Sequence, residues 1–314
     1  MSVDEKSKVY LIGAGPGNPN LLTKKAERCI KKAEVILYDR LVNPLILQYA
    51  PADAEFIDVG KKPYAKHIQQ DEINLKIVEA AKKYQTVIRL KGGDPAIFGR
   101  VTEEVNTLKD YGIEYEIVPG VTSASAAVAT MDLGLTMRSV APSVTFSTGH
   151  FKDSINQETD IRNLINGGTL AIYMGIKRLG RIIDQITAYT SEDYSIAIVF
   201  NATCHNQRVI IGKLSTIEHQ LQQHELEGEP GICILGAIVD YIDKDKVLKQ
   251  EHERNLDDSL YVIKGSKEDA LLKAEELSET GYRCIVHVDE SYHPSQQQLY
   301  TQIINNNKIK YINL

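Results

Sequence analysis

Apolar residues in the first 120 positions gather in short runs, and the segments between these runs carry apolar residues at helical spacing. Within residues 69–84, for example, Ile73, Ile77 and Ala81 fall on one face of a helix. Strand-like runs that alternate with helical segments predict a parallel sheet with helices on both faces. Such sheets bind ligands at the carboxyl ends of their strands. The runs cover residues 9–15, 34–39, 55–60, 86–93 and 115–120.

The pattern changes from residue 143 onward, where strand-like runs follow one another with only one obvious long helical segment, at 179–190. The run at 207–214 comes too soon after the run at 195–201 for a crossover helix, so these two are expected to pair antiparallel. This part of the chain therefore predicts a mixed sheet. Its runs cover residues 143–149, 169–175, 195–201, 207–214 and 230–240.

These patterns predict an α/β protein with two main domains, a parallel-sheet domain at 1–120 and a mixed α/β domain at 121–242. Residues 243–258 form a charged run without apolar periodicity, which is typical of a linker. Two strand-like runs, a helical segment, a polar Gln-rich stretch and a last strand-like run follow. Residues 243–314 are thus expected to be a linker and a small α/β extension that carries no catalytic motif.

Composition narrows the classes of function. The 314 residues carry a net charge of −6, which argues against a nucleic-acid partner. No apolar run reaches membrane-spanning length, and the polar start of the chain lacks the apolar core of a signal peptide. The cysteines are scattered without CxxC spacing, so we expect a cytoplasmic protein without a zinc site or other metal. They are Cys29, Cys204, Cys233 and Cys284.

Glycines follow the first predicted strand in the motif GAGPG, residues 13–17. A dinucleotide-binding fingerprint needs a sixth-position glycine, and Asn18 stands there. A tight turn that needs positive φ explains the motif equally well. A nicotinamide-dependent oxidoreductase therefore remains an alternative of a different class.

A second glycine motif, KGGD, ends the predicted strand at 86–93. Gly92 and Gly93 lack a Cβ atom, so a ligand could lie against bare backbone there. Asp94 before Pro95 also reads as the N-cap and first residue of a helix, which is a purely structural role. Both interpretations stay open.

Two further motifs are equally ambiguous. In PGVTS, Thr122 or Ser123 could cap the small-residue helix that follows, or the start of that helix could receive a ligand carboxylate. Met174, at the end of the run AIYMG, is more often core filler than a ligand contact.

The combination of motifs is more specific than any one of them. In order, the chain contains GAGPGNPNLLTKKA, YDRLV, VGKK, VIRLKGGDPAIFGR, PGVTSASAA, LTMR, STGH and AIYMG. Together these motifs resemble the tetrapyrrole methylase family over about residues 9–240, and the tail lies outside the resemblance. Within the family, the motifs are most similar to those of enzymes that methylate uroporphyrinogen III at C2 and C7, giving precorrin-2 through precorrin-1.

The resemblance implies a homodimer of two-domain subunits, with S-adenosylmethionine bound in the cleft between the domains and S-adenosylhomocysteine as a product. It implies an acid/base pair, Asp39 and Lys61, and substrate-site residues Arg100, Glu103 and Arg138. Ala202 falls where the family usually has a glycine. The cofactor contacts implied by position are Pro16, Gly92, Gly93, Asp94, Ile97, Thr122, Ser123, Met174 and Ala202.

The chemistry of methyl transfer fits these residue types. The sulfonium methyl group is already activated, so the enzyme mainly aligns it with a nucleophilic pyrrole carbon. A proton must then leave the macrocycle, and a carboxylate or a lysine of lowered pKa can accept it. Lys61 could equally pair with substrate carboxylates. Arginine suits the acetate and propionate groups of the substrate because of its bidentate fork.

Three motifs depart from the family pattern. FGRVTEE replaces FGRGGEE, Met137 replaces the histidine of LTHR, and Ala202-Thr203 replaces a glycine-threonine pair. These departures affect the expected substrate contacts more than the expected cofactor contacts. A methylase of another tetrapyrrole intermediate is an alternative within the family. A non-catalytic scaffold is a third class, and the presence of Asp39, Lys61, Asp94 and Arg100 argues against it. Precorrin-2 feeds both sirohaem and cobalamin, and the sirohaem branch is weakly favoured.

Overall fold

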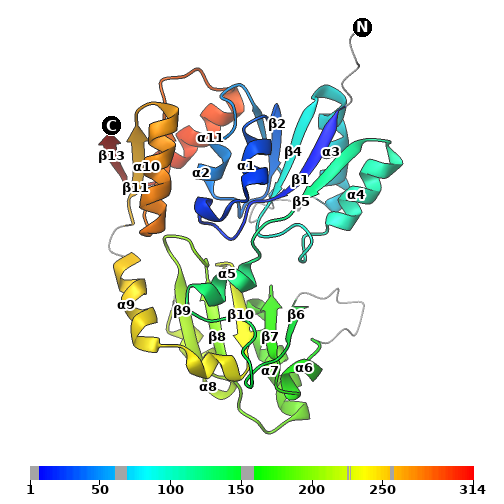
Figure 1. Cartoon of the computed structure of the whole chain (residues 1–314), viewed down its shortest axis with the longest axis vertical. Helices are drawn as coiled ribbons and strands as arrows, with labels where there is room; N and C mark the ends of the chain where they lie inside the picture. Colours follow the sequence, from blue (N-terminus) through cyan, green and yellow to red (C-terminus); the bar gives the residue numbers. More distant parts are fainter. Residues whose placement is uncertain (1–6, 61–68, 150–158, 225, 227, 255–257) are drawn as a thin grey trace. The chain divides into compact units, whose positions relative to one another are not determined.

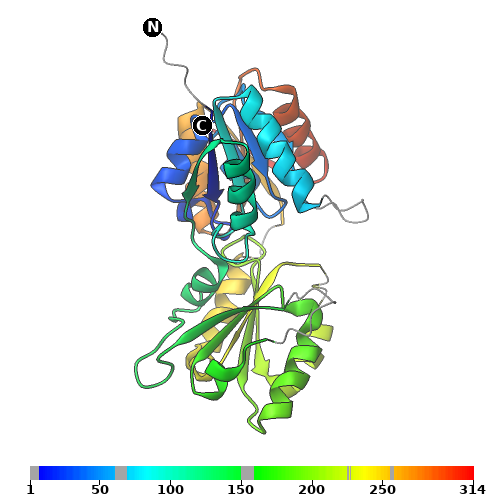
Figure 2. The ribbon, with the colours of Figure 1, turned by 90° about the vertical axis from the view of Figure 1, so that its right-hand side faces the viewer.

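All the strands predicted in the first 120 residues form one parallel sheet in the computed structural model, in the order β3-β2-β4-β1-β5. Helices η1, α1 and α2 pack on one face, and α3 and α4 pack on the other (Figures 1 and 2). The elements are β1 Lys8–Gly13, η1 Pro19–Leu21, α1 Lys24–Ile30, β2 Val35–Tyr38, α2 Pro44–Leu47, β3 Glu55–Asp58, α3 Gln70–Lys83, β4 Thr86–Lys91, α4 Val101–Asp110 and β5 Glu114–Val118.

The structure describes residues 7–60, 69–149, 159–224, 226, 228–254 and 258–314. The chain divides into two units, and each is described by itself. The first unit holds residues 1–122 together with 257–314, and the second holds residues 123–256. Among the described residues, no helix is long and apolar enough to cross a membrane.

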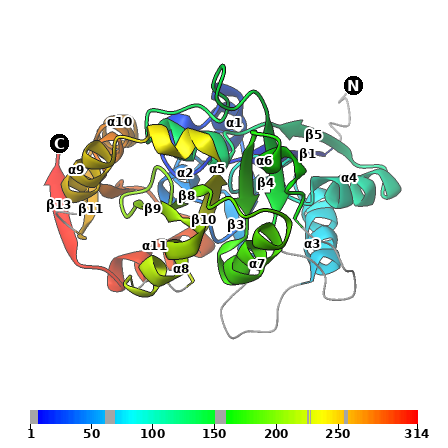
Figure 3. The ribbon, with the colours of Figure 1, turned by 90° about the horizontal axis from the view of Figure 1, so that it is seen from below.

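The second unit contains the predicted mixed sheet, in the order β6-β7-β10-β8-β9. Strands β8 and β9 pair antiparallel, as predicted from their short connection. Helices α7 and α8 cover one face and α5, η3 and α9 the other (Figure 3). The elements are α5 Ser123–Ala129, β6 Val144–Thr148, α6 Arg162–Ile165, β7 Thr169–Tyr173, η2 Ile176–Arg178, α7 Leu179–Tyr189, β8 Ser195–Phe200, β9 Arg208–Lys213, α8 Leu214–Gln222, β10 Gly231–Leu235, η3 Ala237–Tyr241 and α9 Lys244–Arg254.

The charged run expected to be a linker contains helix α9. Although the sequence of this helix is mostly polar, Val247 is buried in the apolar core of the second unit and anchors the helix there. The carboxylate of Glu251 also accepts a hydrogen bond from the Val209 backbone N–H of β9. Val247, the Glu251 contact and an ion pair between Lys246 and Asp132 therefore dock a helix that shows no apolar periodicity.

The C-terminal elements form a three-stranded parallel sheet in the order β12-β11-β13. The Gln-rich stretch that carried no helix prediction is helix α11. His293 caps it, Pro294 occupies its first turn, and Gln296 and Tyr300 are its buried positions. The elements are β11 Leu260–Lys264, α10 Lys267–Glu279, β12 Arg283–His287, α11 Pro294–Asn305 and β13 Ile309–Asn313.

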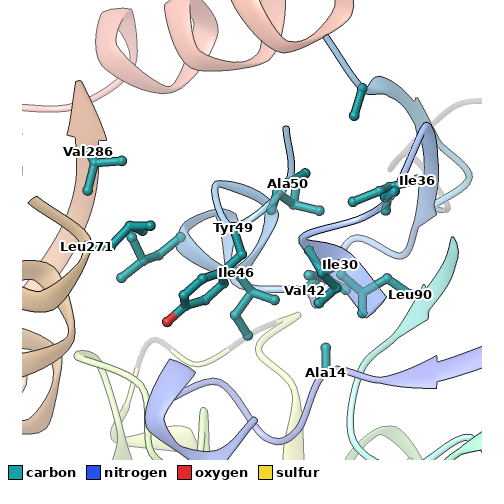
Figure 4. Close-up of a cluster of buried hydrophobic side chains, with 14 of the residues drawn as sticks. Ala14, Ile30, Ile36, Val42, Ile46, Tyr49, Ala50, Leu90, Leu271 and Val286 are labelled. Atoms are coloured by element: carbon teal, nitrogen blue, oxygen red, sulfur yellow. The ribbon is translucent and has the colours of Figure 1, made fainter. Parts of the chain in front are cut away.

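These C-terminal elements share an apolar core with α1 and α2 of the first unit. Leu271 and Val286 lie in the same cluster as Ile46, Tyr49 and Ala50 (Figure 4). The tail is therefore packed as part of the first unit.

Two buried glutamine side chains fasten the tail to the first unit through backbone groups. The Gln48 amide donates to the Val286 carbonyl and accepts from the Val286 N–H, both at 2.7 Å. The Gln296 amide nitrogen donates to the carbonyls of Pro51, at 2.8 Å, and Ala54, at 2.7 Å. Gln48 thus takes the place of a further strand along the edge of β12.

A cluster of buried charges fixes the end of β4. Arg89 and Lys91 lie two residues apart on this strand and therefore on one face of the sheet. The Glu104 carboxylate, on α4, receives Arg89 Nε at 3.1 Å and Lys91 Nζ at 2.8 Å on the same oxygen. The other oxygen, Oε2, is buried and has no hydrogen-bond partner among the described residues. Burial, and next the charge of Arg89, lower the pKa of Lys91.

We expect Gln48→Ala to lower the free energy of unfolding by about 2 kcal/mol, because it leaves the Val286 N–H and carbonyl buried without partners. Urea unfolding followed by fluorescence measures the change. The exposed Gln297 on α11 provides the control, and Gln297→Ala should change stability by less than about 0.5 kcal/mol. Equal midpoints for the two variants would contradict the role assigned to Gln48.

We expect Glu104→Gln to destabilise the protein by about 3 kcal/mol, because two buried cations lose their shared carboxylate. The neighbouring Glu103→Gln breaks only a half-exposed ion pair and should cost less than about 1 kcal/mol. Thermal unfolding at matched ionic strength compares the two. A Glu104→Gln protein as stable as Glu103→Gln would show that the cluster contributes nothing to the fold.

Candidate active site

The two glycine motifs meet at the carboxyl ends of β1 and β4. Gly93 N donates to Gly15 O at 2.7 Å, and Gly15 N donates to Gly93 O at 3.2 Å. The packing is close, since a Cβ atom on Gly13 would lie 2.5 Å from the Gly93 carbonyl oxygen. Gly15 and Gly93 also have positive φ, +72° and +68°, a backbone conformation that favours glycine at both positions. A hypothetical Cβ on Gly93 meets no atom within 4 Å, which leaves one side of this backbone open.

Both carboxylate oxygens of Asp94 accept hydrogen bonds from backbone N–H groups. Its Oδ1 accepts from Ala96 N at 2.7 Å, and its Oδ2 accepts from Gly120 N at 3.1 Å. The expectation that Asp94 caps the next helix is wrong. Residues 95–99 form a turn, and α4 begins only at Val101. Asp94 instead ties the end of β4 to the end of β5.

Three other candidates for cofactor contact lie in the first unit. Pro16, within the GAGPG loop, and Ile97, in the turn after Asp94, are both half-buried. Thr122 immediately precedes helix α5, which begins at Ser123. The structure thus brings Pro16, Gly92, Gly93 and Asp94 to adjacent loops of one sheet edge.

Asp39 lies at the end of β2, next to β4 in the sheet. Its Oδ1 accepts from Arg89 Nη2 at 2.6 Å, and its side chain is 31% exposed while that of Arg89 is 2% exposed. Arg89 is held in turn by Glu104. The carboxylate is therefore oriented from within the protein and still reachable from solvent. Lys61, the other member of the expected acid/base pair, lies outside the described residues.

Arg100 and Glu103 bind each other at the start of α4. Arg100 Nε and Nη2 donate to the two oxygens of Glu103, at 2.8 and 2.6 Å, and both side chains are about half exposed. Arg100 has a left-handed backbone, φ +56°. The bond to Glu103 raises the pKa of the Arg100 guanidinium further. The Glu103 carboxylate thus occupies the bidentate fork of the Arg100 guanidinium.

The candidates of the second unit lie after its strands. Met174 follows β7, is exposed and has φ +55°, an unfavourable conformation for a non-glycine residue. Its exposure excludes the alternative that it fills the core. Ala202 follows β8 and is buried, between the left-handed residues Asn201 and Thr203. Strained residues of this kind are concentrated at functional sites.

Arg138 lies apart from these strand ends in sequence, on a turn. Met137 and Ala141 exchange two backbone hydrogen bonds of 2.8 Å, which places the exposed Arg138 in the tight loop between them. Ser123 begins helix α5, and the next residue, Ala124, donates its N–H to the Tyr173 hydroxyl at 3.4 Å. This contact joins α5 to the end of β7.

Sequence reasoning missed the Arg89–Lys91–Glu104 cluster. A signal was present, because two basic residues at alternate positions interrupt an otherwise apolar strand, VIRLK. Basic residues on a buried strand need a buried acidic partner. The identity of that partner could not be read from the strand, since Glu103 and Glu104 are adjacent and only the orientation of α4 distinguishes them. The described residues contain no group of three or more potential metal ligands.

Comparisons with known proteins agree with this arrangement. Residues 8–218 match the family model for tetrapyrrole (corrin/porphyrin) methylases. The uroporphyrinogen-III C-methyltransferase of Priestia megaterium is 43% identical over 236 residues, which are 74% of this chain and 99% of that protein. A siroheme synthase of Pseudomonas fluorescens is 42% identical over 74% of this chain, which spans only 50% of that protein.

Solved structures include uroporphyrin-III C-methyl transferase of Thermus thermophilus complexed with S-adenyl homocysteine. It is 35% identical, covers 75% of this chain and all of its own, and has a TM-score of 0.64. The fold class expected from the sequence is confirmed by this likeness and by the family match. The family match argues against the alternative that the protein is a nicotinamide-dependent oxidoreductase. The chain belongs to the tetrapyrrole (corrin/porphyrin) methylase family.

Proposed function

We propose that this protein transfers two methyl groups from S-adenosylmethionine to C2 and C7 of uroporphyrinogen III, giving precorrin-2 through precorrin-1. One observation carries the proposal: an open glycine backbone at the ends of β1 and β4 lies beside the strand that presents Asp39, in a chain of this family. The nearly full-length similarity to a uroporphyrinogen-III C-methyltransferase supports the choice of substrate.

The methyl donor fits the first unit by shape. Gly92 and Gly93 offer backbone without side chains, and a Cβ on Gly13 or Gly120 would collide with the Gly93 carbonyl. A residue larger than glycine at position 13 or 120 would push the strand ends apart. We assign Pro16, Gly92, Gly93, Asp94, Ile97 and Thr122 as the donor contacts of this unit, and Ser123, Met174 and Ala202 as those of the second.

The reaction needs little more than alignment and one base. The bond between sulfur and the methyl carbon breaks as the pyrrole carbon attacks that methyl, and S-adenosylhomocysteine leaves. The macrocycle then loses a proton. We assign its acceptance to Asp39, because Arg89 orients this carboxylate and leaves it part-exposed. Lys61 remains a candidate for the second member of the acid/base pair or for an ion pair with a substrate carboxylate.

Substrate carboxylates are assigned to arginines. The Arg100 fork already binds a carboxylate, that of Glu103, in bidentate geometry. A substrate acetate or propionate could replace Glu103 on this fork. Arg138, exposed on its turn, is assigned the same role. A homodimer, a cytoplasmic location and the sirohaem branch complete the proposal.

We expect purified protein, incubated without oxygen with uroporphyrinogen III and S-adenosylmethionine, to add two methyl groups by mass. Asp39→Asn should lower the transfer rate by about 10²- to 10⁴-fold while S-adenosylhomocysteine binding is kept. Asp110→Asn, at the exposed end of α4, is the control and should behave like the wild type. If the protein binds S-adenosylhomocysteine but transfers no methyl group to uroporphyrinogen III, its substrate is another tetrapyrrole. If it neither binds nor transfers, the proposal is rejected.

We expect Arg100→Lys to raise KM for uroporphyrinogen III about tenfold, because an ammonium group cannot bind a carboxylate in bidentate geometry. Glu103→Gln should lower KM, because it weakens the competitor for Arg100. Arg162→Lys alters a similar exposed pair with Asp160 in the second unit and should change neither kcat nor KM. An unchanged KM in both Arg100 and Glu103 variants would remove this pair from the substrate site.

A further inference from the structure

Helix α10 of the tail is bonded to the loop that follows β1. The Asn18 amide nitrogen donates to Glu279 Oε1 at 3.1 Å, and the Asn20 amide nitrogen donates to the Glu275 carbonyl at 3.0 Å. Asn18 and Asn20 come directly after the GAGPG motif. Asn18 Oδ1 also accepts from Asn20 N at 2.9 Å, which caps the short helix η1.

Further contacts make this loop part of one packed layer with the tail. The side chains of Leu22 and Leu277 both pack on the apolar core that α1, α2 and α10 share. The Tyr49 hydroxyl, on the α2 side, bonds to the Glu275 carboxylate of α10. Burial raises the pKa of Tyr49, so its hydroxyl stays protonated and donates. The α10 helix is therefore fixed against the first unit independently of Asn18 and Asn20.

The same loop continues into the glycine bridge. Asn43 Nδ2 donates to the Gly17 carbonyl at 2.9 Å, and Gly15 exchanges two backbone hydrogen bonds with Gly93. Asn18 lies three residues from Gly15 in the chain, and Gly15 is hydrogen-bonded to Gly93. The contacts form an unbroken path from α10 to both glycine motifs.

We propose that helix α10 positions the methyl-donor loop: Glu279 and the Glu275 carbonyl hold Asn18 and Asn20, and thereby hold residues 13–17 in the conformation that receives S-adenosylmethionine. This rests on the proposed function, because that function assigns the donor to the GAGPG and KGGD loops. The family model ends at residue 218, so a segment outside the family match contributes to a site within it. Glu279 and Asn20 are positioning residues and do not touch the donor.

The inference also accounts for Asn18, the residue that stands where a dinucleotide fingerprint has glycine. A glycine could neither cap η1 nor reach Glu279. Because these hydrogen bonds are exposed, each is expected to change donor affinity by no more than about tenfold.

The test compares two variants of the full chain. Glu279→Ala combined with Asn20→Ala removes both bonds and should weaken S-adenosylhomocysteine binding about tenfold by calorimetry. KM for S-adenosylmethionine should rise by a similar factor, with kcat unchanged. Glu276→Ala is the control, because Glu276 lies on the same helix, is exposed, and pairs only with Lys273 among its described contacts. Glu279→Gln, which keeps an acceptor oxygen, should restore the wild-type affinity at that position.

Hydrogen exchange separates positioning from general stability. Amides of residues 15–22 should exchange faster in the double variant and recover protection when S-adenosylhomocysteine is saturating. The melting temperature should stay close to that of Glu276→Ala. If the double variant binds S-adenosylhomocysteine as tightly as the wild type, the inference is overturned. If the wild type itself fails to bind, the proposed function fails, and faster loop exchange in the double variant would still support an ordering role for α10.

Discussion

The paired hydrogen bonds between Gly15 and Gly93 are the constraint on which the first unit depends. They join the loops after β1 and β4 at the edge where parallel sheets bind ligands. A Cβ atom on Gly13 or Gly120 would collide with the Gly93 carbonyl oxygen, and Gly93 itself has positive φ, so each of the three positions favours glycine. The Asp94 carboxylate then holds the third loop, after β5, because its Oδ2 accepts a hydrogen bond from Gly120 N, while its Oδ1 accepts from Ala96 N in the turn that follows Asp94.

The charged residues near the Gly15–Gly93 contact fall into two groups, one buried and one exposed. Inside the sheet, Arg89, Lys91 and Glu104 are buried and neutralise one another with Asp39 at the outer end. At the surface, Arg100 and Glu103 form an ion pair whose side chains are about half exposed. A buried pair gives fixed geometry because breaking it is costly, whereas an exposed pair is weak enough to exchange partners.

The tail shows how an added segment becomes part of an existing unit. Gln48 presents an amide to the edge of β12, and the apolar face of α2 packs against Leu271 and Val286. Unpaired strand edges and bare apolar faces are liabilities for a separate domain. Packing the tail on the first unit covers part of the β12 edge and buries apolar surface of α2, and it brings α10 into contact with the loop after β1.

The sequence by itself determined the strands, the parallel and mixed character of the two sheets, and the glycine motifs at strand ends. Local periodicity and turn chemistry specify such features, because they depend on neighbours in the chain. The sequence did not determine which residues contact one another. Examples are the contacts of Arg89 with Glu104 rather than Glu103, of Asp94 with Gly120, and of Glu279 with Asn18. It also did not predict α9, whose buried apolar anchor is Val247, or α11, whose Gln-rich sequence still packs Leu299, Tyr300 and Ile303 on the core. Those contacts join residues distant in sequence, so only the tertiary structure decides them.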